Sequence, residues 1–247
     1  MSPDARRTKR PRTRDYETAG SPAAGSSSLT ETRRHTGRPA TGAAVSAVTA
    51  LSPDMGFVVL AGVGLASLRL THPVRLTLMW LVELAIVLVY AGSGKLRSSY
   101  TLLNLGRGLL VGIVVSLPLY LAAPDFFYAT ASRLYGIADL QVLLERAVFI
   151  VPLVEGLYFR GAVQRERGLV TAAVLYGLAQ GLIVISAADS YLWVVVAVVL
   201  GMIVAGLLYG YVFKRHGLTA SIACHTAVSF MLFVFPALAM QVSGWLV

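Results

Sequence analysis

Residues 154–161 read V-E-G-L-Y-F-R-G and place two charges, on Glu155 and Arg160, inside a strongly apolar run. On insertion scales each such charge costs about 2.5–3.5 kcal/mol at the centre of a membrane helix, and a charge kept there usually serves a function. Arg160 can reach a membrane edge with its long side chain, so we expect it at the end of its helix. Glu155 lies about 1.5 helical turns deeper. The stretch therefore predicts a membrane protein with a polar pocket below one membrane face.

The composition of the whole chain agrees with a membrane protein. Of its 247 residues, 56% are hydrophobic and 13% are charged, which is far from the averages of soluble domains. The apolar runs contain Gly and Pro, as membrane helices do, and show no alternation typical of a β-barrel. The chain is therefore predicted to be an all-α, polytopic transmembrane bundle. We expect about seven antiparallel spans, each near the roughly 20 residues that a membrane requires, at 55–70, 74–91, 108–123, 142–160, 170–187, 191–213 and 218–235.

The distribution of Lys and Arg predicts the orientation. With a cytoplasmic N-terminus and seven alternating spans, 17 of the 21 Lys and Arg residues fall on the cytoplasmic side. Membrane proteins keep such an excess of positive charge inside. We therefore expect a multi-pass protein of the cell membrane with its N-terminus inside and its C-terminus outside. The basic residues left on the outer side are Arg69, Arg75, Arg133 and Arg146.

Residues 1–42 differ from the rest, because they are polar and rich in Arg, Ser, Thr, Gly and Pro. Such a segment buries too little apolar surface to offset its ordering entropy, and it is predicted to be a disordered, basic cytoplasmic tail. Its positive charge would attract anionic membrane lipid. A nucleic-acid partner is not expected, since the tail lacks interleaved aromatic residues and a folded binding module. Residues 43–247 are then the transmembrane bundle.

Three predicted spans carry polar residues at a similar depth. Glu155 is one of them. Tyr176 with Gln180, and His225 with Ser229, are each spaced i, i+4, so each pair shares a helix face. Counted from the cytoplasmic ends of their spans, these pairs lie roughly 10–16 Å deep. Each residue alone could be an ordinary hydrogen-bond partner between helices, but together they predict one shared cavity in the cytoplasmic half of the bundle.

Glu83 and Cys224 are weaker candidates for functional residues. Glu83 is the other acid inside a predicted span and has no obvious basic partner. Cys224 is the only cysteine, which excludes an intramolecular disulfide. Its neighbour His225 points about 100° away on a helix, so Cys224 is predicted to be a small packing residue.

The polar segments resemble the motifs of the CPBP family, which comprises CAAX prenyl endopeptidases and bacteriocin-processing, Abi-like membrane proteases. The family motif E-E-x-x-x-R resembles residues 155–160, with Gly156 in place of the second Glu. The motif F-x-x-x-H resembles residues 176–180, where Gln180 replaces the His. The motif H-x-x-x-N resembles residues 225–229. The resemblance covers about residues 140–235, which we take as the CPBP-like core.

The resemblance implies hydrolysis of a membrane-proximal peptide by a water molecule held between a Glu and a His. It implies Glu155 as the general base, Arg160 as its orienting partner, and His225 with Ser229 as donors to the oxyanion. Gln180 can position a water molecule but cannot share its proton, and the loss of one acid–base group typically costs about 10²–10⁴ in rate. We therefore expect a protease of reduced activity that acts on a membrane-associated peptide or protein reaching it from the cytoplasmic side.

No cofactor is expected, and a metal site is disfavoured because one Glu and one His fall short of the three protein ligands of a catalytic zinc. Two other functions remain open. A catalytically degenerate relative would bind a membrane partner through the same cavity, as a scaffold or immunity-type protein. A small transporter would use Glu83, Glu155, Gln180 and His225 as a proton or solute path, although the inverted repeat common in transporters is missing.

Overall fold

The computed structural model describes residues 52–94, 96, 101–135, 140–185 and 192–244. The chain divides after residue 40 into two units, and every described residue belongs to the second. The predicted disordered tail, residues 1–42, lies outside the described residues.

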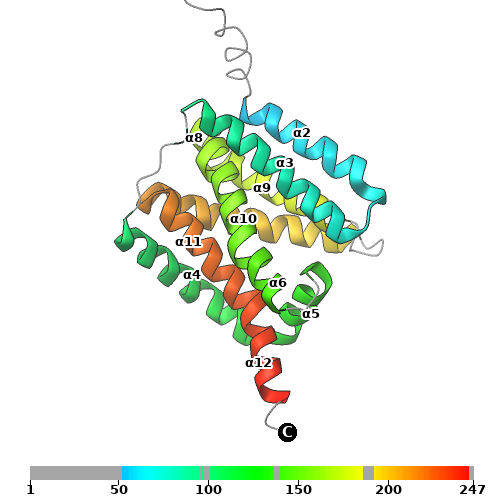
Figure 1. The fold of residues 1–247 in the computed structure, drawn as a ribbon. Helices are drawn as coiled ribbons and strands as arrows, with labels where there is room; N and C mark the ends of the chain where they lie inside the picture. The colour runs from blue at the N-terminus through cyan, green and yellow to red at the C-terminus, as the bar shows by residue number, and fades with distance from the viewer. Residues whose placement is uncertain (1–51, 95, 97–100, 136–139, 186–191, 245–247) are drawn as a thin grey trace, which may run out of the picture. The chain divides into compact units, whose positions relative to one another are not determined.

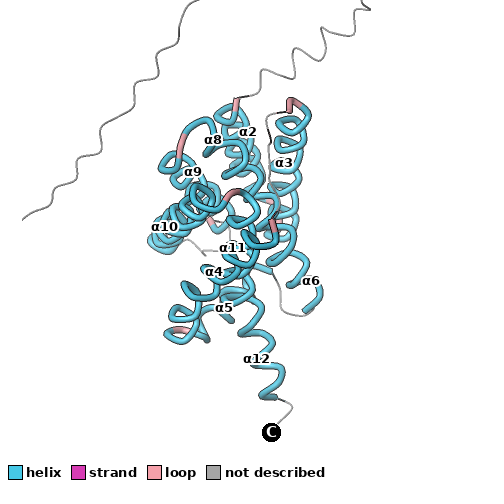
Figure 2. The backbone as a smooth tube through the Cα atoms, turned by 90° about the vertical axis from the view of Figure 1, so that its left-hand side faces the viewer, coloured by secondary structure: helices cyan, strands magenta, loops and turns pink. Residues whose placement is uncertain are grey.

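All regular structure in the described part is helical, which confirms the all-α prediction (Figures 1 and 2). Of the described helices, four are long and apolar enough to cross a membrane, at His72–Gly92, Leu102–Ala122, Leu192–His216 and Leu218–Gln241. In chain order the elements are α2 (Pro53–Ala66), η1 (Ser67–Arg69), α3 (His72–Gly92), α4 (Leu102–Ala122), α5 (Pro124–Tyr135), α6 (Leu140–Leu144), η2 (Glu145–Ile150), α7 (Val151–Glu155), η3 (Gly156–Val163), α8 (Gln164–Arg167), α9 (Leu169–Val184), α10 (Leu192–His216), α11 (Leu218–Ser229), η4 (Phe230–Val234) and α12 (Phe235–Gly244).

The surface of the bundle is apolar and several of its charges are inside. Leu88 and Val204 are 62% and 67% exposed, whereas Arg75 and Glu83 are each only 1% exposed. This is the reverse of a soluble protein, in which charged side chains are almost never fully buried unless paired. A surface of this kind suits a hydrocarbon environment, and the chain is a multi-pass membrane protein.

The helix that carries Glu155 is longer than predicted. Elements α6 to α8 form one unbroken helical stretch that ends at Arg167, not near Arg160. It continues because Gln164 is buried and donates a hydrogen bond from Nε2 to the Gly210 carbonyl at 2.8 Å. Two parts of the stretch, η2 and η3, are π-helical, with i→i+5 hydrogen bonds in place of i→i+4. Arg160 is consequently well inside the bundle and 2% exposed, and the expectation that it reaches a membrane edge is wrong.

A second difference is α5, which the sequence analysis left between two spans. Its residues mix apolar and polar side chains, and Pro124 occupies its first helical position. Proline is favoured there because the first helical N–H groups have no partner within the helix. Figures 1 and 2 show α5 and α6 toward one end of the described helices, with α8 at the other end.

Different polar contacts hold the helices together at each of the two ends of the bundle. At the end where α8 meets α9 and α10 meets α11, which we call the basic end, Asp54 forms an ion pair with Arg167, and the Tyr90 hydroxyl donates to Glu166. At the opposite end, which we call the α5 end, the buried Arg75 donates from Nη2 to the Gly64 carbonyl at 3.0 Å and to a carbonyl of α9. Separate sets of polar contacts thus hold the helices together at the two ends.

Small residues allow α4 and α11 to approach closely. A Cβ atom added at Gly112 would lie 2.5 Å from the Cys224 carbonyl oxygen and 2.7 Å from the Ala227 Cβ. Backbone atoms cannot move aside as a flexible side chain can. Glycine is thus required at this crossing, as in other close contacts between membrane helices.

We predict that Gly112→Ala lowers the free energy of unfolding, because a methyl group here overpacks the crossing at a typical cost of about 1–3 kcal/mol. Gly106→Ala on the same helix is the matched control, since nothing lies within 4 Å of a Cβ at that position. Thermal unfolding of both variants in the same detergent measures the difference. Equal midpoints for the two variants would contradict the close packing.

Candidate active site

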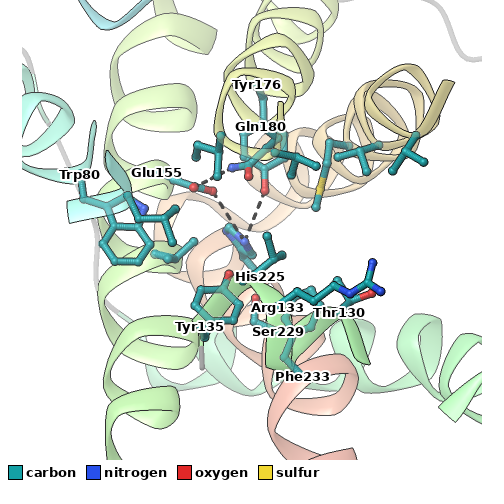
Figure 3. Close-up of a pocket in the computed structure, with 18 of the residues that line it drawn as sticks. Trp80, Thr130, Arg133, Tyr135, Glu155, Tyr176, Gln180, His225, Ser229 and Phe233 are labelled. Carbon is teal, nitrogen blue, oxygen red and sulfur yellow. Dashed lines mark hydrogen bonds and ion pairs between the residues drawn. The ribbon is translucent and has the colours of Figure 1, made fainter. Parts of the chain in front are cut away.

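Glu155, Gln180 and His225 lie together, as their matched depth predicts. Gln180 donates from Nε2 to Glu155 Oε1 at 2.7 Å, and His225 Nε2 lies 3.9 Å from Glu155 Oε2. The Tyr176 hydroxyl is 3.4 Å from His225 Nε2 (Figure 3). These side chains come from α7, α9 and α11, three segments far apart in the sequence. The convergence is confirmed.

The local backbone around Glu155 is unusual. Glu155 is the last residue of α7, and the π-helical segment η3 begins at Gly156. Single π-turns within α-helices are frequently found at functional sites. A Cβ atom at Gly156 would lie 2.6 Å from Cγ1 of Ile222, so α11 occupies the space in which a second Glu would have to begin. The missing carboxylate of the first motif therefore reflects how α7 and η3 pack on α11.

The cluster faces a cavity of about 340 Å³. This volume lies within the roughly 300–1,000 Å³ typical of ligand sites, which combine apolar walls with a few polar groups. Ser229 lines the cavity with His225, as their i, i+4 spacing predicts. The lining residues are Leu76, Trp80, Phe126, Thr130, Arg133, Leu134, Tyr135, Val151, Glu155, Tyr176, Gln180, Ile183, Val184, Val194, Val198, Met202, His225, Ser229 and Phe233.

Arg160 does not pair with Glu155. Within the described ranges no ion pair joins the two residues, and Arg160 is not among the described residues that line the cavity. Its Cζ atom instead lies 4.5 Å from the ring centre of Tyr176 and 5.5 Å from that of Tyr209. A desolvated guanidinium over an aromatic ring can gain about 2 kcal/mol or more. Arg160, which the resemblance implies as the orienting partner of Glu155, thus makes cation–π contacts with two tyrosines.

The same two tyrosines hold His225. The Tyr209 ring stacks on the imidazole with centres 4.5 Å apart and planes 21° apart, while Tyr176 meets it edge-on. Arg160 therefore contacts both rings that position the His225 side chain. Sequence reasoning did not single out Tyr209, because an aromatic residue inside an apolar helix looks like ordinary packing. Tyr176 could be identified from the sequence, because its i, i+4 spacing places it on the same helix face as Gln180.

Glu83 does not line this cavity. It is 1% exposed, its Oε2 has no hydrogen-bond partner in the described part of the chain, and it is not among the described residues that line the cavity. A continuous path from Glu83 through Glu155 to His225, as the transporter hypothesis requires, has no support from this cavity. Among the described residues, no three His, Cys, Asp or Glu side chains gather as a candidate metal site.

We predict that Arg160→Met leaves the free energy of unfolding unchanged or raises it. Methionine fills a similar space, and Arg160 Nε, Nη1 and Nη2 have no hydrogen-bond partner among the described residues, so the charge is buried at a cost. Arg160→Ala should lower the free energy of unfolding by about 2–5 kcal/mol, because it leaves a cavity under the rings. Denaturation of both variants in one detergent compares them, and an equal loss in both would show that the charge itself supports the fold.

A comparison with protein families gave one match within this chain. The model of the family described as type II CAAX prenyl endopeptidase Rce1-like matches residues 138–231. That range contains Glu155, Gln180, His225 and Ser229. Among curated proteins and among solved structures, no similar protein was found. The match confirms the resemblance that the three motifs predicted: residues 138–231 are similar to the Rce1-like family of type II CAAX prenyl endopeptidases.

Proposed function

We propose that this protein is an intramembrane endopeptidase that hydrolyses a membrane-associated peptide with a water molecule activated by Glu155. The observation that carries the proposal is the Glu155 carboxylate itself. It is 1% exposed, is held on one oxygen by Gln180, and faces His225 with the other oxygen inside a ligand-sized cavity. The family of residues 138–231 agrees with this chemistry.

The first step is attack by water. Glu155 Oε2 has no hydrogen-bond partner in the described part of the chain, so it can accept a proton. A general base must lie within hydrogen-bond reach of the proton that it removes. In the proposed step a water molecule gives one proton to Glu155 Oε2, and its oxygen forms a bond with the carbonyl carbon of the peptide. The electron pair of the carbonyl double bond moves to the oxygen, which becomes an oxyanion.

The second step is collapse of the tetrahedral intermediate. His225 is positioned to donate from a ring N–H, and Tyr176 and Ser229 from hydroxyl groups, since all three line the cavity near Glu155. One donor aimed at an oxyanion can be worth about 2.7–4 kcal/mol. As the C–N bond breaks, protonated Glu155 returns its proton to the leaving nitrogen. The Tyr176 hydroxyl adds a donor that the phenylalanine of the family motif lacks.

Gln180 sets the limit on the rate. Its amide holds Glu155 through the hydrogen bond at 2.7 Å, but an amide neither takes up nor releases protons near neutral pH. The site then relies on Glu155 alone for proton transfer. We therefore expect slow cleavage. The best substrates would be those whose scissile peptide bond is held close to Glu155.

The direct test is Glu155→Gln, which keeps the size of the side chain and removes the base. We predict that cleavage of a library of membrane-anchored peptides falls to background. Glu145→Gln, an identical change at an exposed position of the same helical stretch, is the control and should keep full activity. Product detection by mass spectrometry reads out both variants. Undiminished cleavage by Glu155→Gln would show that the base is another residue.

Restoring the second-motif histidine gives a separate prediction. Gln180→His places an imidazole beside Glu155, and cleavage should rise by as much as the about 10²–10⁴ typical of one acid–base group. The gain should vanish when Glu155→Gln is added. Gly156→Glu should not raise activity and should destabilise the bundle, because Ile222 fills the space beside Gly156. An increase with Gly156→Glu would contradict the close packing of Gly156 on Ile222.

A second candidate function is a binding protein of the same fold. It is favoured by the replacement of two family acid–base residues, by Gly156 and Gln180, and by the way Gln180 caps Glu155. Such a protein would hold a membrane partner in the cavity without cleaving it. Absence of cleavage from wild type, Glu155→Gln and Gln180→His alike would support this function over the protease.

A further inference from the structure

A groove separate from the cavity beside Glu155 lies between α3 and the π-helical segment η2. Its volume is about 410 Å³, within the roughly 300–1,000 Å³ typical of ligand sites. In the described part of the chain, it shares no lining residue with the cavity beside Glu155. The residues that line the groove are Pro73, Val74, Thr77, Leu78, Leu81 and Arg146.

The groove is part of the apolar surface of the bundle. Val74 and Leu81, which lie in its wall, are 53% and 57% exposed. The groove begins at Pro73, in the first turn of α3, and follows this helix to Leu81, over a length of about 12 Å. Helix α3 is long and apolar enough to cross a membrane, so its exposed face contacts the hydrocarbon of the lipids. The groove can therefore hold an acyl chain that lies along α3.

Arg146 brings a positive charge into this apolar groove. Among the Lys and Arg residues of the described ranges it is the only half-buried one, since the others are either buried or exposed. No ion pair within those ranges involves Arg146. The other polar side chain of the groove, Thr77, donates its hydroxyl to the Pro73 carbonyl at 2.9 Å and carries no charge. A half-buried guanidinium without a counter-charge from these residues favours an anionic ligand.

The nearest acid in the sequence does not supply this counter-charge. Glu145 is exposed, accepts a hydrogen bond from Gln141 Nε2 at 2.8 Å and does not line the groove. Adjacent residues of a helix point in different directions, so Glu145 and Arg146 do not face each other. The groove thus combines one cation with walls that suit a hydrocarbon chain.

We propose that this groove binds an anionic phospholipid, with the lipid phosphate on Arg146 and one acyl chain along α3. A planar guanidinium can donate two parallel hydrogen bonds to a phosphate, and basic pockets between membrane helices bind anionic lipid headgroups. The long apolar stem of Arg146 can lie against the groove while its charge meets the headgroup. The lipid site rests on the groove and on Arg146, and it does not depend on peptide cleavage.

A lipid in this groove would connect two segments that also form the candidate active site. Helix α3 supplies Leu76 and Trp80 to the cavity beside Glu155, and the helical stretch that contains η2 supplies Val151 and Glu155 itself. The lipid would lie between α3 and η2, outside this cavity. Its binding should therefore stabilise the wall of the site without occupying the space of a substrate.

Native mass spectrometry of the full chain in an uncharged detergent tests the site. Dioleoyl phosphatidylglycerol and dioleoyl phosphatidylcholine are offered at equal concentration, so that only the headgroup differs. The wild type should retain the anionic lipid about fivefold more often, the effect expected of one basic residue close to anionic lipid. Arg146→Gln should remove this preference. Arg69→Gln is the matched control, because it makes the same change at an exposed arginine that does not line the groove, and it should keep the preference.

A second pair of variants tests the groove without changing any charge. Leu81→Trp fills the groove and should lose the retained phosphatidylglycerol. Leu88→Trp should keep it, because Leu88 is 62% exposed on the same helix, does not line the groove, and lies seven residues further on the same helix face. A ligand that binds the folded state stabilises it, so phosphatidylglycerol should also raise the unfolding midpoint of Leu88→Trp but not that of Leu81→Trp.

Three results would overturn the lipid site. An equal preference for phosphatidylglycerol in Arg146→Gln and Arg69→Gln would show that only the overall surface charge matters. Equal retention by Leu81→Trp and Leu88→Trp would place the lipid on another surface. Failure of the wild type to retain phosphatidylglycerol over phosphatidylcholine would show that the groove does not select an anionic headgroup. None of these measurements involves cleavage, so their outcome is distinct from that of the proposed function.

Discussion

The hydrogen bond from Gln180 to Glu155 is the interaction around which the centre of the bundle is organised. A carboxylate that is 1% exposed is tolerable only if neighbouring helices supply polar groups to it. Helix α9 supplies the Gln180 amide, and α11 supplies His225 at 3.9 Å. The tyrosines that hold His225 then also contact Arg160, so a second buried charge shares the same rings. Removing Gln180 would leave Glu155 Oε1 without its hydrogen-bond donor.

The degenerate motifs have a physical explanation in this group. Gly156 lies against Ile222, so a second carboxylate and the present position of α11 exclude each other. Gln180 gives up proton transfer but keeps a donor on Glu155. Tyr176 adds a hydroxyl near His225. The site thus remains polar, connected and open to a cavity, although it has one carboxylate and one imidazole where the family motifs have two of each.

Helical periodicity was enough to predict which residues meet. Tyr176 with Gln180 and His225 with Ser229 share helix faces by spacing alone, and the length of the apolar runs fixed their depth. The contacts of Arg160 could not be predicted from helical spacing, because its long side chain can reach several rings and carboxylates once the helices have packed. Helix α5 was missed because its mixed composition carries no span signal. Because α5 supplies part of the cavity wall, the full lining of the cavity could not be predicted from the sequence.

The π-turn after Glu155 has a consequence for how charges in membrane helices are interpreted. In an α-helix two residues five positions apart differ in direction by roughly 140°, so if Glu155 faced inward Arg160 would face toward the lipid. A π-turn bonds residue i to i+5 and brings these two positions nearly into phase. Because η3 begins at Gly156, both charges are buried on the inner side of one helix. The π-turn thus carries one extra residue between the two charges: without that residue they would be four positions apart in an α-helix, about 40° apart in direction, and would again share the inner face.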